Sequence, residues 1–261
     1  MTFCQLLKMK LLWRKIRKNR NYKLVAEGYD KLNLGHNGIS EGEEEEAPYV
    51  YEKLSLYLIP SSKILDAGCG DGRVLKYFKD RNIIGIDISP VNIEKASQYA
   101  KCFVSTIENI DFPNNEFDLV IANGVVEHLI DIEQGLKQFH RILKPNGILF
   151  LYTDNTLWQL LTCVRDFVAK NKYKRLIQPI DGDFTYWGLK RLLDKARFKI
   201  LEYEGYGCLP FLGRLSSKFF EVETHPIFKY FTTRIVVIAR KEKDTLVNFK
   251  HNLHPLNCTK F

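Results

Sequence analysis

The chain has 261 residues, of which 45% are hydrophobic and 27% are charged, and its formal net charge is +8. This composition excludes a globally disordered chain, and the length predicts one α/β domain with additions or at most two domains. No stretch approaches the roughly 18 to 20 uncharged apolar residues that span a bilayer, so we expect no transmembrane helix.

Residues 1–47 are predicted to form an N-terminal extension. Lysines and arginines interrupt every apolar run there, so a cleaved secretory signal is not expected. A solvated face is the first interpretation of this basic segment; an anionic membrane surface, RNA or an acidic substrate are the alternatives. Residues from Asn33 to Glu46 are expected to be exposed loop and, with His36, a candidate lid. The basic side chains are Lys8, Lys10, Arg14, Lys15, Arg17, Lys18, Arg20 and Lys23.

Short apolar runs alternate with amphipathic stretches from residue 48 to residue 155. The apolar runs predict strands at Lys63–Asp66, Asn82–Ile88, Lys101–Val104, Phe117–Ala122 and Ile148–Tyr152. The amphipathic stretches predict helices at Pro48–Leu58, Arg73–Lys79, Pro90–Tyr99 and Ile132–Leu143. Strands that alternate with helices predict a mostly parallel sheet with helices on both faces.

The remainder of the predicted domain, which extends over residues 48–241, is less regular. Helices are expected at Thr156–Ala169 and Tyr186–Ala196, and strands at Phe198–Tyr203 and Arg234–Ala239. Between these strands lies an aromatic-rich insertion, residues 205–231. It either roofs an apolar substrate pocket or forms a satellite core. Residues 242–261 are expected to be a polar tail.

The most informative stretch follows the first predicted strand, where the sequence reads ILDAGCGDGR from Ile64 to Arg73. Glycines after a strand let a ligand approach the backbone, and the next helix directs its free N–H groups toward that ligand. A dinucleotide pattern would place its third glycine at Arg73. Asp66 would repel a pyrophosphate but suits an ammonium group, and Asp87, which closes the second strand, suits ribose hydroxyls.

These residues resemble motif I and the following acidic position of the class I, Rossmann-like S-adenosylmethionine-dependent methyltransferases. The resemblance is to methyltransferase type 11 and to the small-molecule enzymes of the ubiquinone-biosynthesis kind. It covers about residues 48–155 with strong motifs. It implies a seven-stranded sheet with an antiparallel last strand, and S-adenosyl-L-methionine as cofactor. The cofactor contacts that it implies are Asp66, Gly68, Cys69, Gly70, Gly72, Asp87, Ile88, Ile107, Glu108, Asn123 and Gly124.

One position departs from the family pattern. Many relatives carry an acid that pairs with the adenine amino group, and Thr106 stands at its place in this chain. Either Thr106 or Glu108 takes over this role, or backbone and apolar contacts hold the adenine.

His128 is the candidate catalytic residue, because it follows the fourth predicted strand on the edge where ligands bind in open α/β sheets. An imidazole titrates near neutrality and can accept a proton from a hydroxyl acceptor. The alternative is that His128 only orients the cofactor loop. Some relatives carry a Glu-x-x-Glu-His metal site here, but Gly124 replaces the first acid. Two remaining ligands make a poor magnesium site, so we expect no metal.

The sequence therefore predicts methyl transfer to a small-molecule or lipid-linked acceptor, with a hydroxyl as the expected acceptor group. The alternatives are an RNA methyltransferase and a non-catalytic cofactor-binding scaffold. The basic extension favours the former, although no RNA-binding module appears. A nicotinamide-dependent oxidoreductase is disfavoured by Asp66 and Arg73. Six scattered cysteines indicate a reducing, cytoplasmic location, with membrane-surface contact through the basic N-terminus as a further hypothesis. No obligate protein partner is expected.

Overall fold

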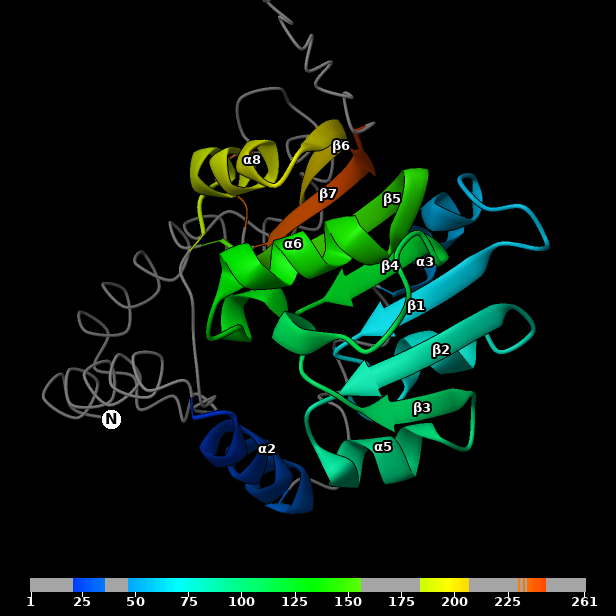
Figure 1. Ribbon diagram of the computed structural model, residues 1–261, viewed down its shortest axis with the longest axis vertical. Helices are drawn as coiled ribbons and strands as arrows, with labels where there is room; N and C mark the ends of the chain where they lie inside the picture. The colour runs from blue at the N-terminus through cyan, green and yellow to red at the C-terminus, as the bar shows by residue number, and fades with distance from the viewer. Residues whose placement is uncertain are drawn as a thin grey trace, which may run out of the picture.

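The computed structural model describes residues 21–35, 47–155, 184–206, 230, 232 and 234–242. Within these residues, seven strands form one sheet in the order β3-β2-β1-β4-β5-β7-β6 (Figure 1). Strands β1 to β5 pair in parallel, whereas β7 is antiparallel to both β5 and β6. The strands are β1 (Lys63–Ala67), β2 (Asn82–Asp87), β3 (Lys101–Val104), β4 (Phe117–Asn123), β5 (Leu143–Asp154), β6 (Phe198–Tyr206) and β7 (Arg234–Lys241). The predicted sheet and its antiparallel last strand are confirmed.

All but the first of the described helices lie close to the predicted positions, whereas the sequence predicted no helix at residues 22–35. The described helices are α2 (Tyr22–Gly35), α3 (Ala47–Ser55), α4 (Arg73–Tyr77), α5 (Pro90–Ala96), α6 (Ile132–Ile142) and α8 (Tyr186–Lys195), with short 3-10 turns η1 (Ile107–Asn109) and η2 (Val126–His128). The expectation of exposed loop from Asn33 was wrong at its start, because α2 continues through Gly35.

Side-chain caps explain where three helices begin. The side chain of Ser89 accepts a hydrogen bond from the Asn92 N–H at the start of α5, and Asp131 does the same for Gln134 at the start of α6. Thr185 caps α8 at Gly188. Each cap satisfies a backbone donor that lacks a partner in the first turn of a helix.

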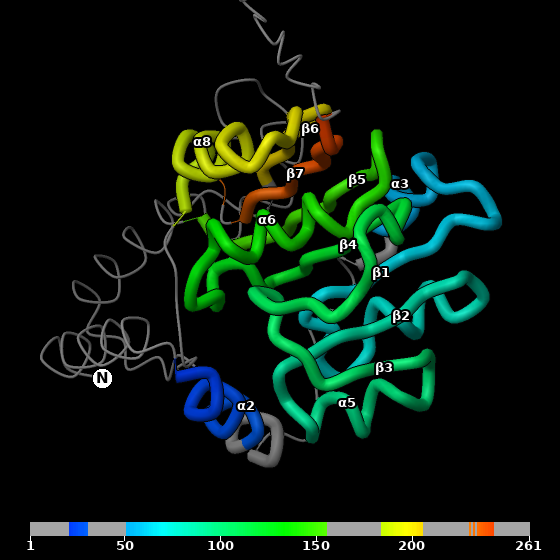
Figure 2. Tube along the Cα trace, in the orientation of Figure 1, coloured from blue at the N-terminus to red at the C-terminus, as the bar shows by residue number. Residues whose placement is uncertain are grey.

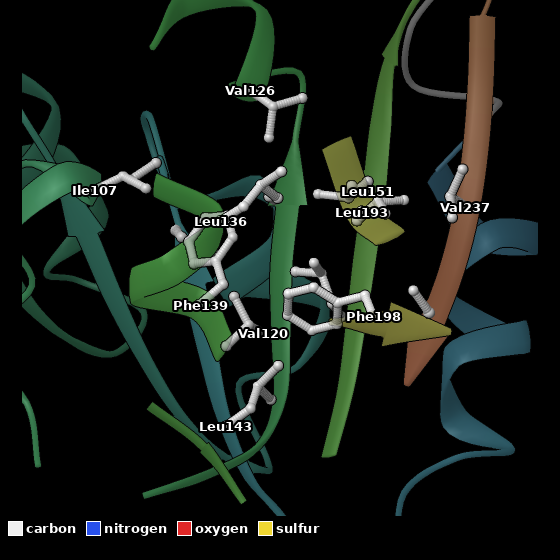
Figure 3. Packing of buried hydrophobic residues seen from close by; sticks show 14 of the residues in the cluster. Ile107, Val120, Val126, Leu136, Phe139, Leu143, Leu151, Leu193, Phe198 and Val237 are labelled. Carbon is white, nitrogen blue, oxygen red and sulfur yellow. The ribbon is translucent and has the colours of Figure 1, made fainter. Parts of the chain in front are cut away.

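The sheet is buried on both faces, because successive residues of a strand point to opposite sides. In β4, Val120 and Ala122 join the cluster under α6 and α8, whereas Leu119 and Ile121 join the cluster under α3, α4 and α5. Figure 3 shows the first cluster, in which Phe139 of α6 and other apolar side chains pack over the strands. This two-sided burial explains the continuous apolar run that predicted β4.

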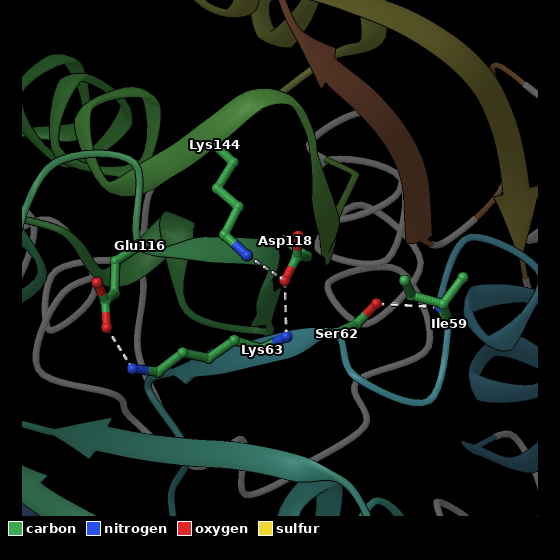
Figure 4. Close-up of polar contacts among 6 residues, drawn as sticks. All are labelled: Ile59, Ser62, Lys63, Glu116, Asp118 and Lys144. Carbon is green, nitrogen blue, oxygen red and sulfur yellow. Dashed lines mark hydrogen bonds and ion pairs between the residues drawn. The ribbon is translucent and has the colours of Figure 1, made fainter.

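Charged side chains tie the strands together at the amino edge of the sheet (Figure 4). One carboxylate oxygen of Asp118 accepts hydrogen bonds from the Lys63 backbone N–H and from the Lys144 ammonium, each at 2.8 Å. The Lys63 ammonium pairs with Glu116. These contacts fix β1 against β4 and lie at the end of the sheet opposite to the glycine loop.

Helix α2 packs against the opposite edge of the sheet, where the parallel strands have their carboxyl ends. The arrowheads of β1 to β4 point toward the side of the molecule where α2 lies, next to α5 (Figures 1 and 2). The buried side chain of Val25 contacts Tyr29, Ile88 and Ile130, which lie in α2 and in the loops after β2 and η2. Part of the predicted extension therefore covers the carboxyl edge of the sheet.

Some sequence-based expectations fall on residues outside the described ranges. These are the basic segment before residue 21, His36, the helix expected at Thr156–Ala169, most of the 205–231 insertion and the tail. Among the described residues, none of the helices has the length and apolar character that crossing a membrane requires.

Candidate functional site

The predicted site residues come together because β1, β2 and β4 are adjacent and parallel. The glycine loop follows β1, Asp87 ends β2 and Asn123 ends β4. The ladder pairs Ala67 with Ile86, and Asp66 with Ile121. The three strand ends therefore meet at one edge of the sheet, where open α/β sheets bind ligands.

Each of the three glycines in the loop has a backbone conformation that L-residues avoid. Their φ angles are 79° at Gly68, 52° at Gly70 and 97° at Gly72. The Gly68 and Cys69 N–H groups both donate to the Ile86 carbonyl, at 2.8 and 2.9 Å. These bonds hold the start of the loop against β2, and Gly72 serves as the N-cap of α4.

The first two glycines face different surroundings. A Cβ on Gly68 would lie 2.4 Å from a Val125 methyl carbon, so the loop packs directly on the segment after β4. A Cβ on Gly70 would meet no atom within 4 Å. Gly68 is thus required by close packing within the protein, whereas Gly70 borders open space that a ligand can enter.

The Asp87 carboxylate is buried and is held by backbone and side-chain donors. One oxygen accepts from the Gly70 N–H at 2.9 Å, and the other from the Ser89 N–H at 2.8 Å and the Asn92 amide at 3.3 Å. Burial raises the pKa of Asp87, while these donors act in the opposite direction. The side chain therefore links the end of β2 to the glycine loop and fixes a carboxylate beside it.

Asp66 is the most unusual group of the site. Only 1% of it is exposed, and neither of its carboxylate oxygens has a hydrogen-bond partner among the described residues. Burial, and next the nearby Asp87, raise its pKa well above the ordinary value. A buried carboxylate without a partner is costly, so this geometry favours a ligand that brings a positive charge or a donor.

Tyr51 of α3 is a site residue that the sequence analysis missed. The Asn123 amide donates to its hydroxyl oxygen at 2.8 Å, and Asp66 lies close enough to raise the pKa of Tyr51 further, after burial as the larger cause. Its position on the apolar face of a predicted helix gave no functional signal, since a tyrosine there also suits a core. The structure joins it to the end of β4.

His128 lies at the end of η2 with only 11% of its side chain exposed. Its Nε2 lies 3.9 Å from a Glu127 carboxylate oxygen, and its ring meets the Tyr29 ring edge-on at a centroid distance of 6.0 Å. The second Glu127 oxygen accepts from the Thr153 hydroxyl at 2.9 Å. Burial raises the pKa of Glu127, and His128 opposes this rise. The His128 ring and the Glu127 carboxylate therefore lie next to each other after β4.

The remaining predicted contacts have structural partners in the described residues. Ile107 is buried in the core under α6. One Glu108 carboxylate oxygen accepts from the Ile130 N–H at 2.9 Å and from the Asp131 N–H at 3.3 Å. Ile88 packs against Val25 of α2. Their contacts with a cofactor stay predictions.

Helix α2 is fixed to the same edge by a polar contact. The Ser89 hydroxyl donates to an Asp30 carboxylate oxygen at 2.5 Å, so α2 is bonded to the residue that follows Ile88. Together with the Tyr29 ring, this contact places α2 beside both His128 and the end of β2. The arrangement can exclude water from a ligand bound along the strand ends.

Comparisons with known proteins identify the family to which this fold belongs. Residues 65–151 match the model of a methyltransferase domain family. A ubiquinone biosynthesis O-methyltransferase of Bradyrhizobium sp. is 34% identical over 182 residues, which cover 62% of this chain and 68% of that protein. The corresponding protein of Bradyrhizobium diazoefficiens is 35% identical over 116 residues, which cover 40% of this chain and 45% of its own length. That second match therefore spans less than half of the relative.

A solved structure supports the fold alone, since its sequence identity is low. The 1,6-didemethyltoxoflavin-N1-methyltransferase of Burkholderia thailandensis, with its substrate and S-adenosylhomocysteine bound, has a TM-score of 0.58 and 20% identity. The comparison covers 86% of this chain and 90% of that one.

Proposed function

This chain belongs to the class I S-adenosylmethionine-dependent methyltransferases, and we propose that it methylates a hydroxyl oxygen of a small-molecule or lipid-linked acceptor. The O-methyltransferases among its relatives support the choice of oxygen. The most similar stretches span only 45% of several of these relatives, so their acceptors are not assigned to this chain.

The residues of the site fit the cofactor of this family. The orphaned Asp66 carboxylate offers a partner for an ammonium group, and the space beside Gly70 admits a ligand against the backbone. The Asp87 carboxylate is fixed at the end of β2, where a ribose would lie. The Asp66 carboxylate, which is buried and has no hydrogen-bond partner among the described residues, is the observation that carries the proposal, since a nicotinamide dinucleotide would bring a pyrophosphate to the same loop.

S-adenosylmethionine supplies a methyl group that its sulfonium already activates. The chain must therefore bind the donor, align the acceptor and exclude water, and this positioning lowers much of the barrier. In the proposed arrangement the glycine loop and Asp87 hold the donor. Helix α2, with Tyr29 and Asp30, closes over the edge from the side of β2. Helix α2 is thus the proposed lid.

His128 is the proposed general base for the acceptor hydroxyl. It would take the hydroxyl proton as the oxygen attacks the methyl carbon, and the Glu127 carboxylate 3.9 Å away would stabilise the imidazolium that forms. The Thr153 hydroxyl holds Glu127 in place. Positioning of the loop by His128 is the competing role.

Calorimetric titration tests the cofactor assignment. We expect S-adenosylhomocysteine to bind at micromolar concentration and NAD not to bind. Asp87→Ala should weaken binding by about 10- to 100-fold, as expected for lost hydrogen bonds to a carboxylate. Asp80→Asn is the matched control, because Asp80 is exposed in the loop between α4 and β2 and should leave binding unchanged. Binding of NAD without S-adenosylhomocysteine would overturn the proposal.

A second experiment tests the acceptor and the base. Phenolic and quinol acceptors, with and without a prenyl chain, are assayed beside RNA for transfer of a labelled methyl group. Methylated RNA with no small-molecule product would refute the acceptor class. His128→Asn should lower kcat by roughly 10²- to 10⁴-fold without changing the affinity for S-adenosylhomocysteine. An equal loss of that affinity would instead assign His128 to positioning the loop.

A further inference from the structure

Two thiols face each other beside the glycine loop. Cys69 lies inside the loop and is buried, whereas Cys102 lies on β3 and is half-buried. Both sulfur atoms lie 3.0 Å from the point that a Cβ on Gly85 would occupy. The Cys69 thiol donates to the Gly70 carbonyl at 3.8 Å, and the Cys102 thiol donates to the Ala100 carbonyl at 3.4 Å. Both are reduced in the structure.

Gly85 makes this approach possible. It lies in β2, opposite Cys102 on β3 and Asp66 on β1. A side chain at this position would press on both sulfur atoms and also on Leu75, whose methyl carbon lies 2.9 Å from the same point. Because residue 85 has no side chain, two thiols that are 33 positions apart in the sequence both approach the same point on β2.

We propose that Cys69 and Cys102 form a reversible disulfide under peroxide, and that this bond lowers the affinity of the site for its cofactor. The second half of this inference rests on the function proposed above, whereas the first half depends only on the two thiols. No other pair of cysteines in the described residues shares this arrangement, since Cys69 and Cys102 are the cysteines that those residues contain.

The chemistry balances with hydrogen peroxide as the oxidant. The Cys102 thiolate, which is the more accessible of the two, attacks one peroxide oxygen and becomes a sulfenic acid while hydroxide leaves. The Cys69 sulfur then attacks the Cys102 sulfur, the S–S bond forms and the sulfenic oxygen leaves as water. Two thiols lose two electrons and two protons in total, and one peroxide becomes two waters.

Burial sets the rate at which this pair responds. It raises the pKa of both thiols, so little of the reactive thiolate is present at neutral pH. We therefore expect disulfide formation over a sustained exposure to peroxide rather than in seconds. A pair that reacts slowly remains reduced under ordinary conditions and changes state only during prolonged oxidation.

The disulfide would move the glycine loop rather than β3, because Cys102 is held more firmly than Cys69. Cys102 is held in the ladder between β2 and β3, whereas Cys69 belongs to a loop of glycines with positive φ. Closing the two sulfur atoms to bonding distance would therefore move Cys69 and its neighbours Gly68 and Gly70. Gly70 donates to Asp87, so the shift reaches the proposed ribose contact. Linkage requires that bound cofactor in turn protects the thiols.

The test uses the full chain and reads the disulfide directly. The protein is treated with hydrogen peroxide, free thiols are alkylated, and tryptic peptides are analysed by mass spectrometry. The sequence places Cys69 in peptide 64–73 and Cys102 in peptide 102–137, each as its single cysteine. We expect these two peptides to be cross-linked, at the mass of two hydrogens below their sum, and the cross-link to be lost on reduction. S-adenosylhomocysteine should slow its formation.

Calorimetry then measures the consequence. Oxidised protein should bind S-adenosylhomocysteine more weakly by a factor on the order of 5 to 150, the usual range for coupled sites, and dithiothreitol should restore binding. Cys102→Ser is the control, because Cys102 is not placed in the binding site, and it should bind normally before and after peroxide. Absence of the cross-link, or a cross-link with unchanged affinity, would overturn the inference. Failure of the reduced protein to bind would instead refute the proposed function, since the peptide readout still reports on the thiols.

Discussion

Alanine at the first glycine of the loop should destabilise the fold, whereas alanine at the second should mainly weaken binding. Gly68→Ala combines an unfavourable φ of 79° with a Cβ that lies 2.4 Å from one Val125 methyl carbon and 2.8 Å from the Val125 Cβ. Since the Val125 Cβ is attached directly to backbone, the clash cannot be relieved by a rotamer change alone.

The magnitude follows from two separate costs. A left-handed conformation costs a residue with a side chain roughly 1–2 kcal/mol, and overpacking typically costs about 1–3 kcal/mol, so Gly68→Ala should lose about 2–5 kcal/mol. Gly70→Ala has a φ of 52° but no atom within 4 Å of its Cβ. It should therefore lose only the backbone cost, roughly 1–2 kcal/mol, while its methyl group enters the space assigned to the ligand.

Urea unfolding followed by circular dichroism measures both variants, and a double-mutant cycle isolates the contact. Val125→Gly removes all three atoms that the new Cβ would meet. In that background Gly68→Ala should cost about 1–3 kcal/mol less than in the wild type. Equal unfolding midpoints for wild type and Gly68→Ala, or a cycle with no coupling, would refute the packing that the structure shows between the loop and the segment after β4.

Three further predictions concern a buried acid and two polar contacts. Because the pKa of Asp66 is raised in the folded protein, its protonated carboxyl is tolerated at low pH, and the folded state loses stability as the pH rises through that pKa. Asp66→Asn removes the ionisation and should therefore raise the Tm of the ligand-free protein more at pH 8 than at pH 5. Thermal unfolding with and without S-adenosylhomocysteine checks this, and the ligand-induced rise in Tm should be smaller in the variant than in the wild type. A Tm difference between variant and wild type that narrows as the pH rises would contradict the reasoning. Arg141 donates to the Ile110 and Phe112 carbonyls at 2.7 and 2.6 Å, so Arg141→Ala should lose about 2–3 kcal/mol in urea unfolding, and a loss under 1 kcal/mol would show that water replaces these bonds. Asp118→Ala should lose only about 1 kcal/mol, because Asp118 is about one-third exposed, and should leave cofactor affinity unchanged; a changed affinity would show that the amino edge is coupled to the site.

Much of the fold could be read from the sequence, because it depends on local patterns. The apolar runs and the glycine and proline positions predicted each described strand within a few residues. The longest difference is β5, which begins at Leu143 rather than Ile148 and passes through Asn146 at a φ of 65°. An Asn-Gly pair after proline has the local signature of a turn, and the ladder is irregular at this point, since Leu143 pairs with Phe117 and Ile148 with Leu119. Strand β5 therefore begins before this irregularity rather than after it.

Part of the candidate site could also be predicted from the sequence, and part could not. Glycines at residues 68, 70 and 72, and an acid at the end of each of the first two strands, are visible in the chain because their spacing is local. Contacts between distant segments are not visible in this way. Nothing in the sequence indicated that one carboxylate oxygen of Glu108 accepts hydrogen bonds from the Ile130 and Asp131 N–H groups. The loop expected from Asn33 begins later than predicted, because α2 continues through Gly35.

What the sequence determined by itself was the series of strands, helices and backbone conformations that the residues prefer, together with the edge of the sheet at which the site must lie. Only the tertiary structure decided that Tyr51 would bond to Asn123, 72 residues away, and that Asp66 would be buried with no partner in the described part of the chain. It also decided that Cys69 and Cys102 would approach the same point on β2. Backbone preference and hydrophobic periodicity act over a few residues and can be read along the chain. Burial, the clash at Gly68 and the meeting of two thiols depend on which distant segments pack together, and that is set by the folded sheet as a whole.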